Sequence, residues 1–527
     1  MIMIHKSYKI LTAAILLCMA GCSKDLDRQP LDSLGNTTYW SSQQDAERTV
    51  TEIYRYLGSN ERFFISCATD DSYSWSNWPV DIQFVANGSA TPGTGTFGNF
   101  WKNLYQQVAR ANDVTDNIDR VPDLDPAVKA RLLGEARFLR AYAYQQLTGL
   151  FGDVPLITHI QASDEFNIAK TPREEIVQYI LDELSAISSD LPETYAASEY
   201  GRITKGAALA LKARVELYNE RWQEAAVTAK QVMDLGVYQI DNNYLSLFNG
   251  DNKQSKEIIV SAQYLPNVYP NPNATWIGAP SLAGWGQIVP LRSLVDAYEC
   301  VDGLPIDESP LYDANRPFEN RDPRLKLSIV VPGTQVNNSV IDITRAGSPD
   351  ALGQSNASFS GYYYKKYVPT TISGGWETSS AADVMILRYA EVLLTYAEAK
   401  VESGQIDQSV YDAINQVRQR NGVNMPAATT ANHPDQGSLR ELIRRERHVE
   451  FPVEDNRLFD IRRWRIAEEV MPGRAQGIFN NFDSSRDDYN NYVLVETRNF
   501  NPSRDYLWPI PANEISLNNS ITQNAGW

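Results

Sequence analysis

Cysteine is scarce in this sequence: the 527 residues include four, and two of these, Cys18 and Cys22, lie near the N-terminus. The other two are Cys67 and Cys300. No Cys-x-x-Cys pattern occurs, which argues against a zinc ribbon or a redox pair. An exported chain can form a disulfide, and the sequence gives no distance between Cys67 and Cys300, so a bridge stays an alternative. We expect two buried free thiols.

Motifs for metal, cofactor or nucleophile chemistry are also missing. The four histidines show no H-E-x-x-H spacing, and the chain has no G-x-S-x-G, Walker or EF-hand pattern. Residues 93–98 match G-x-G-x-x-G, but no hydrophobic strand precedes them, so we interpret them as a glycine loop and not as a dinucleotide site. The acidic run 483–488 is typical of a solvated loop. We predict no catalytic residue, no metal and no cofactor.

Acidic residues outnumber basic ones, 65 to 48, which gives a formal net charge of -17. This charge argues against nucleic acid or an anionic membrane surface as a partner, because both reward a basic face. A glycosidase needs only two suitably spaced carboxylates, so that alternative stays open. The chain shows neither alternating strands and helices nor the many strands of common glycosidase folds, and we therefore favour a protein that is not an enzyme.

Long hydrophobic runs are confined to the N-terminus. Lys6 and Lys9 precede an uncharged apolar run over residues 10–20, which is shorter than the roughly 20 residues of a membrane-spanning helix and typical of a secretory signal. Small residues lead into Cys22, as in lipoprotein signals. We predict a signal peptide over 1–21 and a lipidated Cys22 with its tether over 22–40, which anchors the protein without spanning the membrane. The alternative is an ordinary cleavage site followed by a chance cysteine.

Many segments of the sequence have apolar residues at the spacing of an α-helix. Asp125-Pro126 offers an N-cap and a proline at the first helical position. Apolar residues then follow at spacings of three and four, and we expect Gly149, Gly152 and Pro155 to end the helix. Residues 171–174 predict a capping box for a helix that continues to residue 187.

Two helix–turn–helix pairs are similar to tetratricopeptide units of ~34 residues. They span 207–236 and 388–420, and helices over 100–118 and 438–451 add to them. Such pairs stack, because they cannot bury their faces alone. Residues 60–100 and the insert at about 240–385 are instead rich in Gly, Pro, Asn, Ser and Trp. We predict a mainly α fold with a single domain over 41–527, in which a helical scaffold carries long irregular loops and short strands.

Five blocks resemble signatures of the RagB/SusD family and occur in the family's order. Together they extend over essentially the whole chain after the signal. The last block departs from the family at Ala525, where proline is usual, and at Trp527, where tyrosine is common. The blocks are Gly134–Leu156, Gly201–Ala208, Leu387–Ala399, Arg444–Trp464 and Pro509–Trp527.

The resemblance implies a surface lipoprotein of the outer membrane that captures oligosaccharide and does no chemistry on it. It also implies a partner, a TonB-dependent transporter of the SusC type, over which the protein would sit as a lid. Two alternatives stay open. One is a lid or assembly subunit with little glycan affinity of its own, and the other is a subunit that binds peptides.

Charged residues recur within these blocks on helices that also have apolar faces. We interpret them as ion pairs between packed helices and not as ligand contacts, because buried arginines favour bidentate carboxylate partners. The set is Arg137, Arg140, Arg388, Glu391, Arg444, Glu446, Arg457 and Asp460.

Tryptophans in polar loops mark the candidate glycan site. Exposed indole rings stack on the C–H faces of sugars, and amide or carboxylate side chains bind the hydroxyl groups. The predicted site residues are Asp71, Trp75, Asn77 and Trp78 in one loop, Trp276 and Trp285 in a second, and Trp376 in a third. The tryptophans that lie on or beside helices are expected in the core, and these are Trp101, Trp222 and Trp464.

Overall fold

The computed structural model describes residues 39–527, apart from 59, 163, 337–338 and 370–379. The fold is mainly helical with short two-stranded sheets, as the sequence predicts. The predicted signal peptide, Cys22 and all but the end of the predicted tether lie outside the described residues. Within the described ranges, no helix combines the length and the apolar character that crossing a membrane requires.

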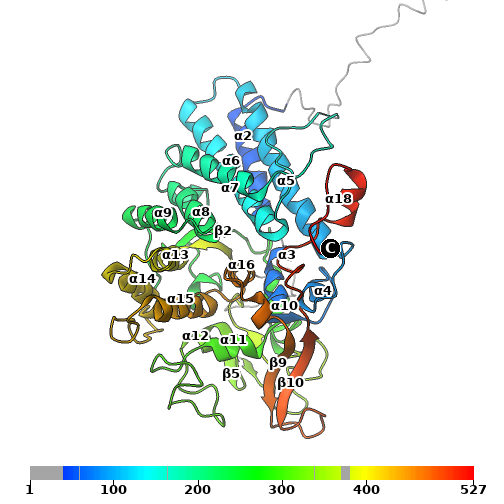
Figure 1. The fold of residues 1–527 in the computed structure, drawn as a ribbon, viewed down its shortest axis with the longest axis vertical. Helices are drawn as coiled ribbons and strands as arrows, with labels where there is room; N and C mark the ends of the chain where they lie inside the picture. The colour runs from blue at the N-terminus through cyan, green and yellow to red at the C-terminus, as the bar shows by residue number, and fades with distance from the viewer. Residues whose placement is uncertain (1–38, 59, 163, 337–338, 370–379) are drawn as a thin grey trace, which may run out of the picture.

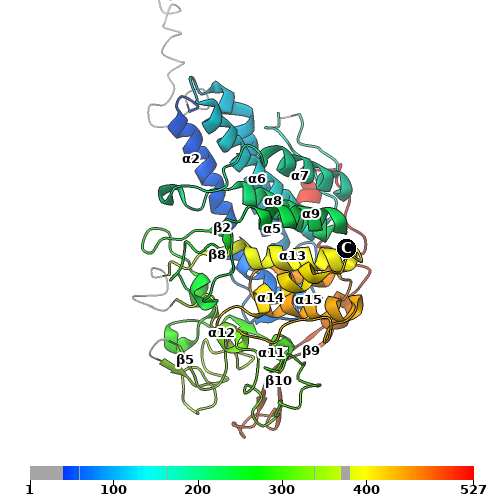
Figure 2. The same cartoon turned by 90° about the vertical axis from the view of Figure 1, so that its left-hand side faces the viewer.

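The long helices form a scaffold in which sequential neighbours pack side by side. The first helices gather at one end of the molecule (Figure 1), and α9 packs against both α8 and α13, which continues the stack (Figure 2). The scaffold helices are α2 (Gln43–Tyr54), α5 (Gly95–Asn117), α6 (Pro126–Phe151), α7 (Arg173–Ile187), α8 (Lys205–Tyr218), α9 (Trp222–Asp234), α13 (Tyr389–Glu402), α14 (Gln408–Arg418), α15 (Gln436–Glu450) and α16 (Asn456–Arg463).

Both predicted helical pairs are confirmed. In the first, the Thr204 side chain caps α8 by accepting from the Ala207 backbone N–H at 3.1 Å, and α9 is followed by Gly236 at φ 67°. In the second, α13 and α14 are joined through Gly404 at φ 71°. Glycine adopts this left-handed conformation at little cost, so it ends each helix cleanly.

Helix α6 begins as predicted and ends at Phe151, within the predicted segment, with Gly152 as its C-cap residue. The Asp125 carboxylate accepts from the backbone N–H groups of Ala127 and Val128 at 2.8 and 3.1 Å. The helix continues through Gly149 to Phe151, because Gly149 serves a helix contact and not a terminus. A Cβ atom at Gly149 would lie 2.6 Å from the Phe459 ring of α16.

The predicted capping box of α7 is wrong. Pro172 is the N-cap residue and no side chain within the segment caps the helix. The Asp153 carboxylate accepts from the Arg173 backbone N–H at 2.8 Å instead, so the cap comes from a residue twenty positions earlier. Thr171 pairs with Val154 in an isolated antiparallel bridge, which brings Asp153 to this position.

The glycine-rich segment 93–98 forms the start of α5. The Asp81 carboxylate accepts from the backbone N–H groups of Gly95 and Thr96 at 2.9 and 2.7 Å. A carboxylate thus occupies the helix N-terminus where a dinucleotide fingerprint would hold phosphate, which agrees with the interpretation that this is not a cofactor site.

The remaining segments form short strands and helices, of which α11, α12, β5 and the pair β9 and β10 lie at the other end of the molecule from α2 (Figure 1). Every strand pair is antiparallel. The pairs are β1 (Ser72–Ser74) with β3 (Ile288–Pro290), β2 (Ile258–Ala262) with β8 (Val384–Arg388), β4 (Ile329–Val330) with β7 (Tyr363–Tyr364), β5 (Thr334–Val336) with β6 (Ser339–Ile341), and β9 (Gly473–Asn480) with β10 (Asn491–Arg498). The short helices are α3 (Asn60–Phe63), α4 (Gln83–Ala86), α10 (Asn273–Ile277), α11 (Arg292–Ala297), α12 (Arg324–Ser328), α17 (Ala467–Val470) and α18 (Ala512–Leu517).

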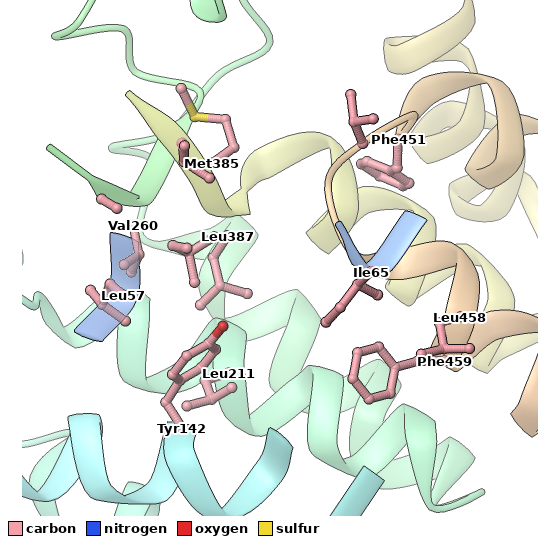
Figure 3. Close-up of a cluster of buried hydrophobic side chains, with 14 of the residues drawn as sticks. Leu57, Ile65, Tyr142, Leu211, Val260, Met385, Leu387, Phe451, Leu458 and Phe459 are labelled. Carbon is pink, nitrogen blue, oxygen red and sulfur yellow. The ribbon is translucent and has the colours of Figure 1, made fainter. Parts of the chain in front are cut away.

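One hydrophobic core joins the scaffold to the loop-rich part. Figure 3 shows its centre, where side chains from α6 and α8 meet strands β2 and β8 and helix α16. Full burial of one such aliphatic or aromatic side chain contributes about 1.5–3 kcal/mol. The labelled residues are Leu57, Ile65, Tyr142, Leu211, Val260, Met385, Leu387, Phe451, Leu458 and Phe459.

A buried ion-pair network lies beside this core, and Glu450 at the end of α15 is its centre. The Glu450 carboxylate contacts Arg388 and Arg420 at 2.7 Å each and Arg324 at 3.0 Å. Glu257 contacts Arg388 at 2.8 Å and also pairs with Arg420. These side chains come from β8, α12, α15 and two loops, so the network ties the scaffold to the loop-rich part.

Other charged residues of the predicted set also pair between elements, which confirms their interpretation as ion pairs. Arg137 and Arg140 of α6 share Glu183 of α7, and Glu391 of α13 accepts from Arg214 of α8. Arg444 is the exception, because its ion pair is with Glu441 of its own helix at 3.9 Å. The remaining pairs are Glu446 with Arg324 and Arg418, Arg457 with Asp70, and Asp460 with Arg447 and Arg463.

The two cysteines within the described residues are free and buried, as expected. Cys67 and Cys300 are both fully enclosed. Burial raises the pKa of the Cys67 thiol to about 12, so this thiol stays protonated and unreactive at neutral pH.

The network predicts a loss of stability in acid. Burial alone would raise the pKa of Glu450, but its three guanidinium partners outweigh burial and lower this pKa from 4.5 to about 2. As the pH falls, the Glu450 carboxyl takes up a proton in the unfolded chain before it does so in the folded protein. The contribution of Glu450 to the free energy of unfolding is therefore complete above about pH 5 and is lost between pH 4.5 and 2. We expect Glu450→Gln to lower the free energy of unfolding by about 3 kcal/mol at pH 7, and by less at each lower pH.

Urea denaturation across a pH series measures this difference. Glu319→Gln is the matched control, because Glu319 is 53% exposed in its pair with Arg316, and we expect a change within about 0.5 kcal/mol. Parallel stability curves for the wild type and Glu450→Gln between pH 7 and 2.5 would contradict the assignment.

Candidate functional site

The pairing of β1 with β3 brings two of the predicted loops together. Tyr73 lies opposite Val289 in this antiparallel ladder, and the Trp75 backbone N–H continues it by donating to the Gln287 carbonyl at 3.4 Å. Residues 70–78 and 273–287 therefore lie side by side, although about 200 residues separate them in sequence.

The second loop is closed on itself by backbone hydrogen bonds. Trp285 and Gln287 donate backbone N–H groups to the carbonyls of Thr275 and Trp276 at 2.6 and 2.7 Å. The close approach requires glycine at position 284, because a Cβ atom there would lie 2.1 Å from the Gly278 carbonyl oxygen. The loop thus has a defined shape without a ligand.

Four rings make up what we call the aromatic surface: Trp75, Trp78, Trp285 and Phe359. Trp78 is 58% exposed and Phe359 50% exposed. The Trp78 and Trp285 rings have centroids 6.3 Å apart, and Trp75 stacks on Phe359 at 6.3 Å with an interplanar angle of 22°. Rings of this kind, partly exposed and fixed beside one another, present broad apolar faces to a ligand.

Hydrogen bonds fix the Trp75 indole and the Trp78 backbone of the first loop. The Trp75 Nε1–H donates to the carbonyls of Trp285 and Gly286 at 3.3 and 3.0 Å. The Gln287 side-chain amide donates to the Trp78 carbonyl at 2.5 Å. These hydrogen bonds join the two loops, so the aromatic surface forms only when both loops are in place.

Trp276 is buried and does not present its ring to solvent. It is 4% exposed on α10, with its ring 4.5 Å from that of Phe64 and 6.1 Å from that of Trp78. This placement corrects the prediction that Trp276 contacts a ligand directly. Its role in the structure is to support Trp78 from the core side.

Asp71 is also buried, with 1% of its surface exposed, which corrects its prediction as a ligand contact. It pairs with His448 at 2.5 Å, while neighbouring Asp70 receives two hydrogen bonds from Arg457 at 2.9 and 2.6 Å. Burial alone would raise the pKa of Asp70, but Arg457 outweighs burial and holds this pKa below its ordinary value. The carboxylates fasten the start of β1 to α15 and α16.

Asp70, Asp71 and His448 offer ligand atoms within 4.8 Å of one another, a grouping that spacing along the chain did not reveal. The Arg457 guanidinium donates to Asp70 and lies 3.8 Å from the Asp71 carboxylate. We therefore interpret the group as an ion-pair cluster beneath the aromatic surface.

The remaining predicted residues have mixed positions. Asn77 is exposed beside Trp78, so its amide is available to a ligand. Trp376 lies outside the described residues. Trp101 is in the core as expected, with 4% exposed, whereas Trp222 and Trp464 are only partly buried.

Phe359 is the site residue that the sequence analysis missed. It lies in Ala357-Ser358-Phe359-Ser360-Gly361, an aromatic residue among small polar ones, which is the same signal that marked Trp75 and Trp78. A search for aromatic residues of any type in polar loops would have found it.

The closed loop predicts a specific sensitivity. Gly284→Ala should lower the free energy of unfolding by about 1–3 kcal/mol, because the added Cβ forces backbone apart, and should increase hydrogen exchange at residues 275–287. Gly98→Ala is the matched control, since nothing lies within 4 Å of a Cβ at that helical position and alanine favours helix. Unchanged exchange in Gly284→Ala would show that the loop tolerates the side chain.

The sequence matches profiles of a known protein family and the sequences of several characterised proteins. Residues 246–527 match the profile described as the SusD family, and residues 26–217 match one described as "Starch-binding associating with outer membrane". A SusD-like protein of Formosa agariphila is 25% identical, over 98% of this chain and 99% of its own. Starch-binding protein SusD of Bacteroides thetaiotaomicron is 25% identical, over 78% of this chain and 75% of its own.

The fold is also similar to solved structures. A SusD-like carbohydrate binding protein from Bacteroides fragilis aligns with a TM-score of 0.85 and 29% identity, and the alignment covers 92% of this chain and 100% of that one. A second SusD-like protein from the same organism aligns with a TM-score of 0.83 and 29% identity, over 95% of this chain and 100% of that one.

Proposed function

This chain belongs to the SusD family, and from that membership we propose that it binds an oligosaccharide at the cell surface without catalysis. The observation that carries the proposal is the aromatic surface. Trp78 and Phe359 expose about half of their area, the rings of Trp75 and Trp285 lie beside them, and the exposed Asn77 adds an amide. Such a set matches the apolar faces and hydroxyl groups of a sugar chain.

The relatives support a glycan in preference to other ligands. One profile that matches this chain is named for starch binding, and so is the relative from Bacteroides thetaiotaomicron. None of the four rings of the aromatic surface carries a charge, so we infer that this surface takes uncharged sugar residues. Trp376, close in sequence to the described part, is proposed as a further contact.

The same proposal gives the protein a place and a partner. We infer that Cys22 carries the acyl chains that anchor the protein to the outer membrane. The phrase "associating with outer membrane" in the matching profile supports this location. The partner we propose is a TonB-dependent transporter of the SusC type, to which the captured oligosaccharide is delivered.

A second candidate function is a lid or assembly subunit of the transporter with little glycan affinity, and a third is a peptide-binding subunit. Exposed aromatic rings favour the glycan, because a lid has no need of an indole exposed to solvent. Co-purification with the transporter in the absence of measurable glycan binding would favour the lid.

Calorimetric titration of the chain from Ser23 to Trp527 against a panel of neutral oligosaccharides tests the proposal. We expect one class to bind, and Trp78→Ala and Phe359→Ala each to weaken this binding by about tenfold, equivalent to about 1.4 kcal/mol. Phe166→Ala is the matched control, since Phe166 is 61% exposed and lies outside the aromatic surface; its affinity should be unchanged.

The same mixtures are assayed for new reducing ends. We expect none, because the proposed site binds without cleaving. Formation of new reducing ends would contradict the absence of catalysis, and equal binding by the wild type, Trp78→Ala and Phe359→Ala would place any glycan elsewhere.

A further inference from the structure

A cavity that is separate from the aromatic surface lies at the loop end of the β9–β10 hairpin. Its volume is about 550 Å³, within the range of small-molecule sites. The walls come from α11, the loop over residues 312–321, the end of α12 with the residues after it, and the hairpin. Segments from distant parts of the sequence thus converge on one concave site, which we call the hairpin cavity.

Aromatic rings form much of the wall. Phe479 and Tyr492 of the hairpin meet edge to face at 5.2 Å, and Phe318 meets Tyr362 at 6.2 Å in the same manner. The lining rings are Tyr312, Phe318, Tyr362, Phe479, Phe482 and Tyr492. Sugar rings pack on such surfaces through their C–H faces.

Unused hydroxyl groups accompany these rings. Tyr362 is 3% exposed, and within the described ranges its hydroxyl makes no hydrogen bond; the same holds for Tyr312 and Tyr492. These hydroxyl groups belong to residues in the wall of an open cavity, where each can hydrogen-bond to a polar ligand.

Positive charge exceeds negative charge in the cavity wall. Four cationic side chains line it against two carboxylates, Asp296 and Glu319. The cations are Arg292, Arg316, Arg321 and Lys326. This excess is notable in a chain whose net charge is -17.

Two of these cations lack a carboxylate partner in the described part of the chain. Arg321 is held by backbone carbonyls alone, those of Val295, Pro317 and Tyr298. Lys326 is exposed at the rim, and no ion pair joins it to another described residue. Arg292 pairs with Asp296 at 2.8 Å and lies 3.6 Å above the Tyr492 ring, so it is fixed in the wall.

We propose that the hairpin cavity binds an anionic sugar residue, a uronate or a sulfated hexose. The rings fit the apolar faces of the sugar, the tyrosine hydroxyls fit its hydroxyl groups, and the unpaired cations fit its acid group. An inorganic anion would leave the rings without contacts. Phe359 faces Trp75 while Tyr362, three residues later, lines the cavity, so segment 359–362 separates the two sites.

This second site does not depend on the proposed function of the aromatic surface, and a titration distinguishes them. The probes are tetrasaccharides of galacturonate, of mannuronate and of sulfated galactose, each beside its methyl ester or desulfated form. We expect at least one charged probe to bind about tenfold or more tightly than its uncharged form, and its affinity to fall with added salt.

Two variants locate the binding. Tyr362→Phe removes only the unpaired hydroxyl and Lys326→Gln only the rim charge, and each should weaken the charged probe by about three- to fivefold. Trp78→Ala should change its affinity by less than about twofold. Thermal unfolding of each variant confirms that the fold is kept.

The contrary results are equally specific. The proposal is overturned if no charged probe binds more tightly than its uncharged form. It is also overturned if the binding responds to Trp78→Ala while Tyr362→Phe and Lys326→Gln leave it unchanged, because the aromatic surface would then be the site. If Trp78→Ala loses binding of the neutral glycan but still binds the charged probe, the two ligands bind at separate sites, as proposed.

Discussion

The charge balance around Glu450 is the constraint on which the rest of the structure depends. Three guanidinium groups share this one buried carboxylate, and removing any partner would leave an uncompensated charge in a medium of low dielectric constant. The partners come from α12, from β8 and from the loop after α14. The ion pairs around Glu450 therefore fix the position of the loop-rich part relative to the scaffold. The shared hydrophobic core also holds the two together, but hydrophobic contacts by themselves are non-directional.

The aromatic surface is connected to the scaffold through a second set of ion pairs. Arg457 on α16 and His448 on α15 hold Asp70 and Asp71, and β1 begins at the next residue. Strand β1 then pairs with β3 and so fixes the loop that carries Trp285. The indoles at the surface are thus the last members of a chain of contacts that begins in the buried charge network.

The sequence predicted what is encoded locally and missed what depends on distant contacts. Asp125-Pro126 and the periodicity after it were sufficient to locate α6, and the family blocks were sufficient to predict the mainly helical fold. The cap of α7 was missed because Asp153 reaches it only through the bridge between Val154 and Thr171. In the site, the exposure of Trp78 and the burial of Trp276 could not be distinguished, since both lie in polar loops and only the packing against Phe64 separates them.

The closed loop that carries Trp285 also has a kinetic consequence. Because backbone hydrogen bonds and the close Gly278–Gly284 contact shape the loop before any ligand arrives, binding costs little conformational entropy in the protein. Encounter then needs no rearrangement, and related ligands differ in how long they stay more than in how fast they arrive. From the proposed function we expect a surface of partly exposed rings to release its ligand quickly, so that a bound oligosaccharide can be passed on.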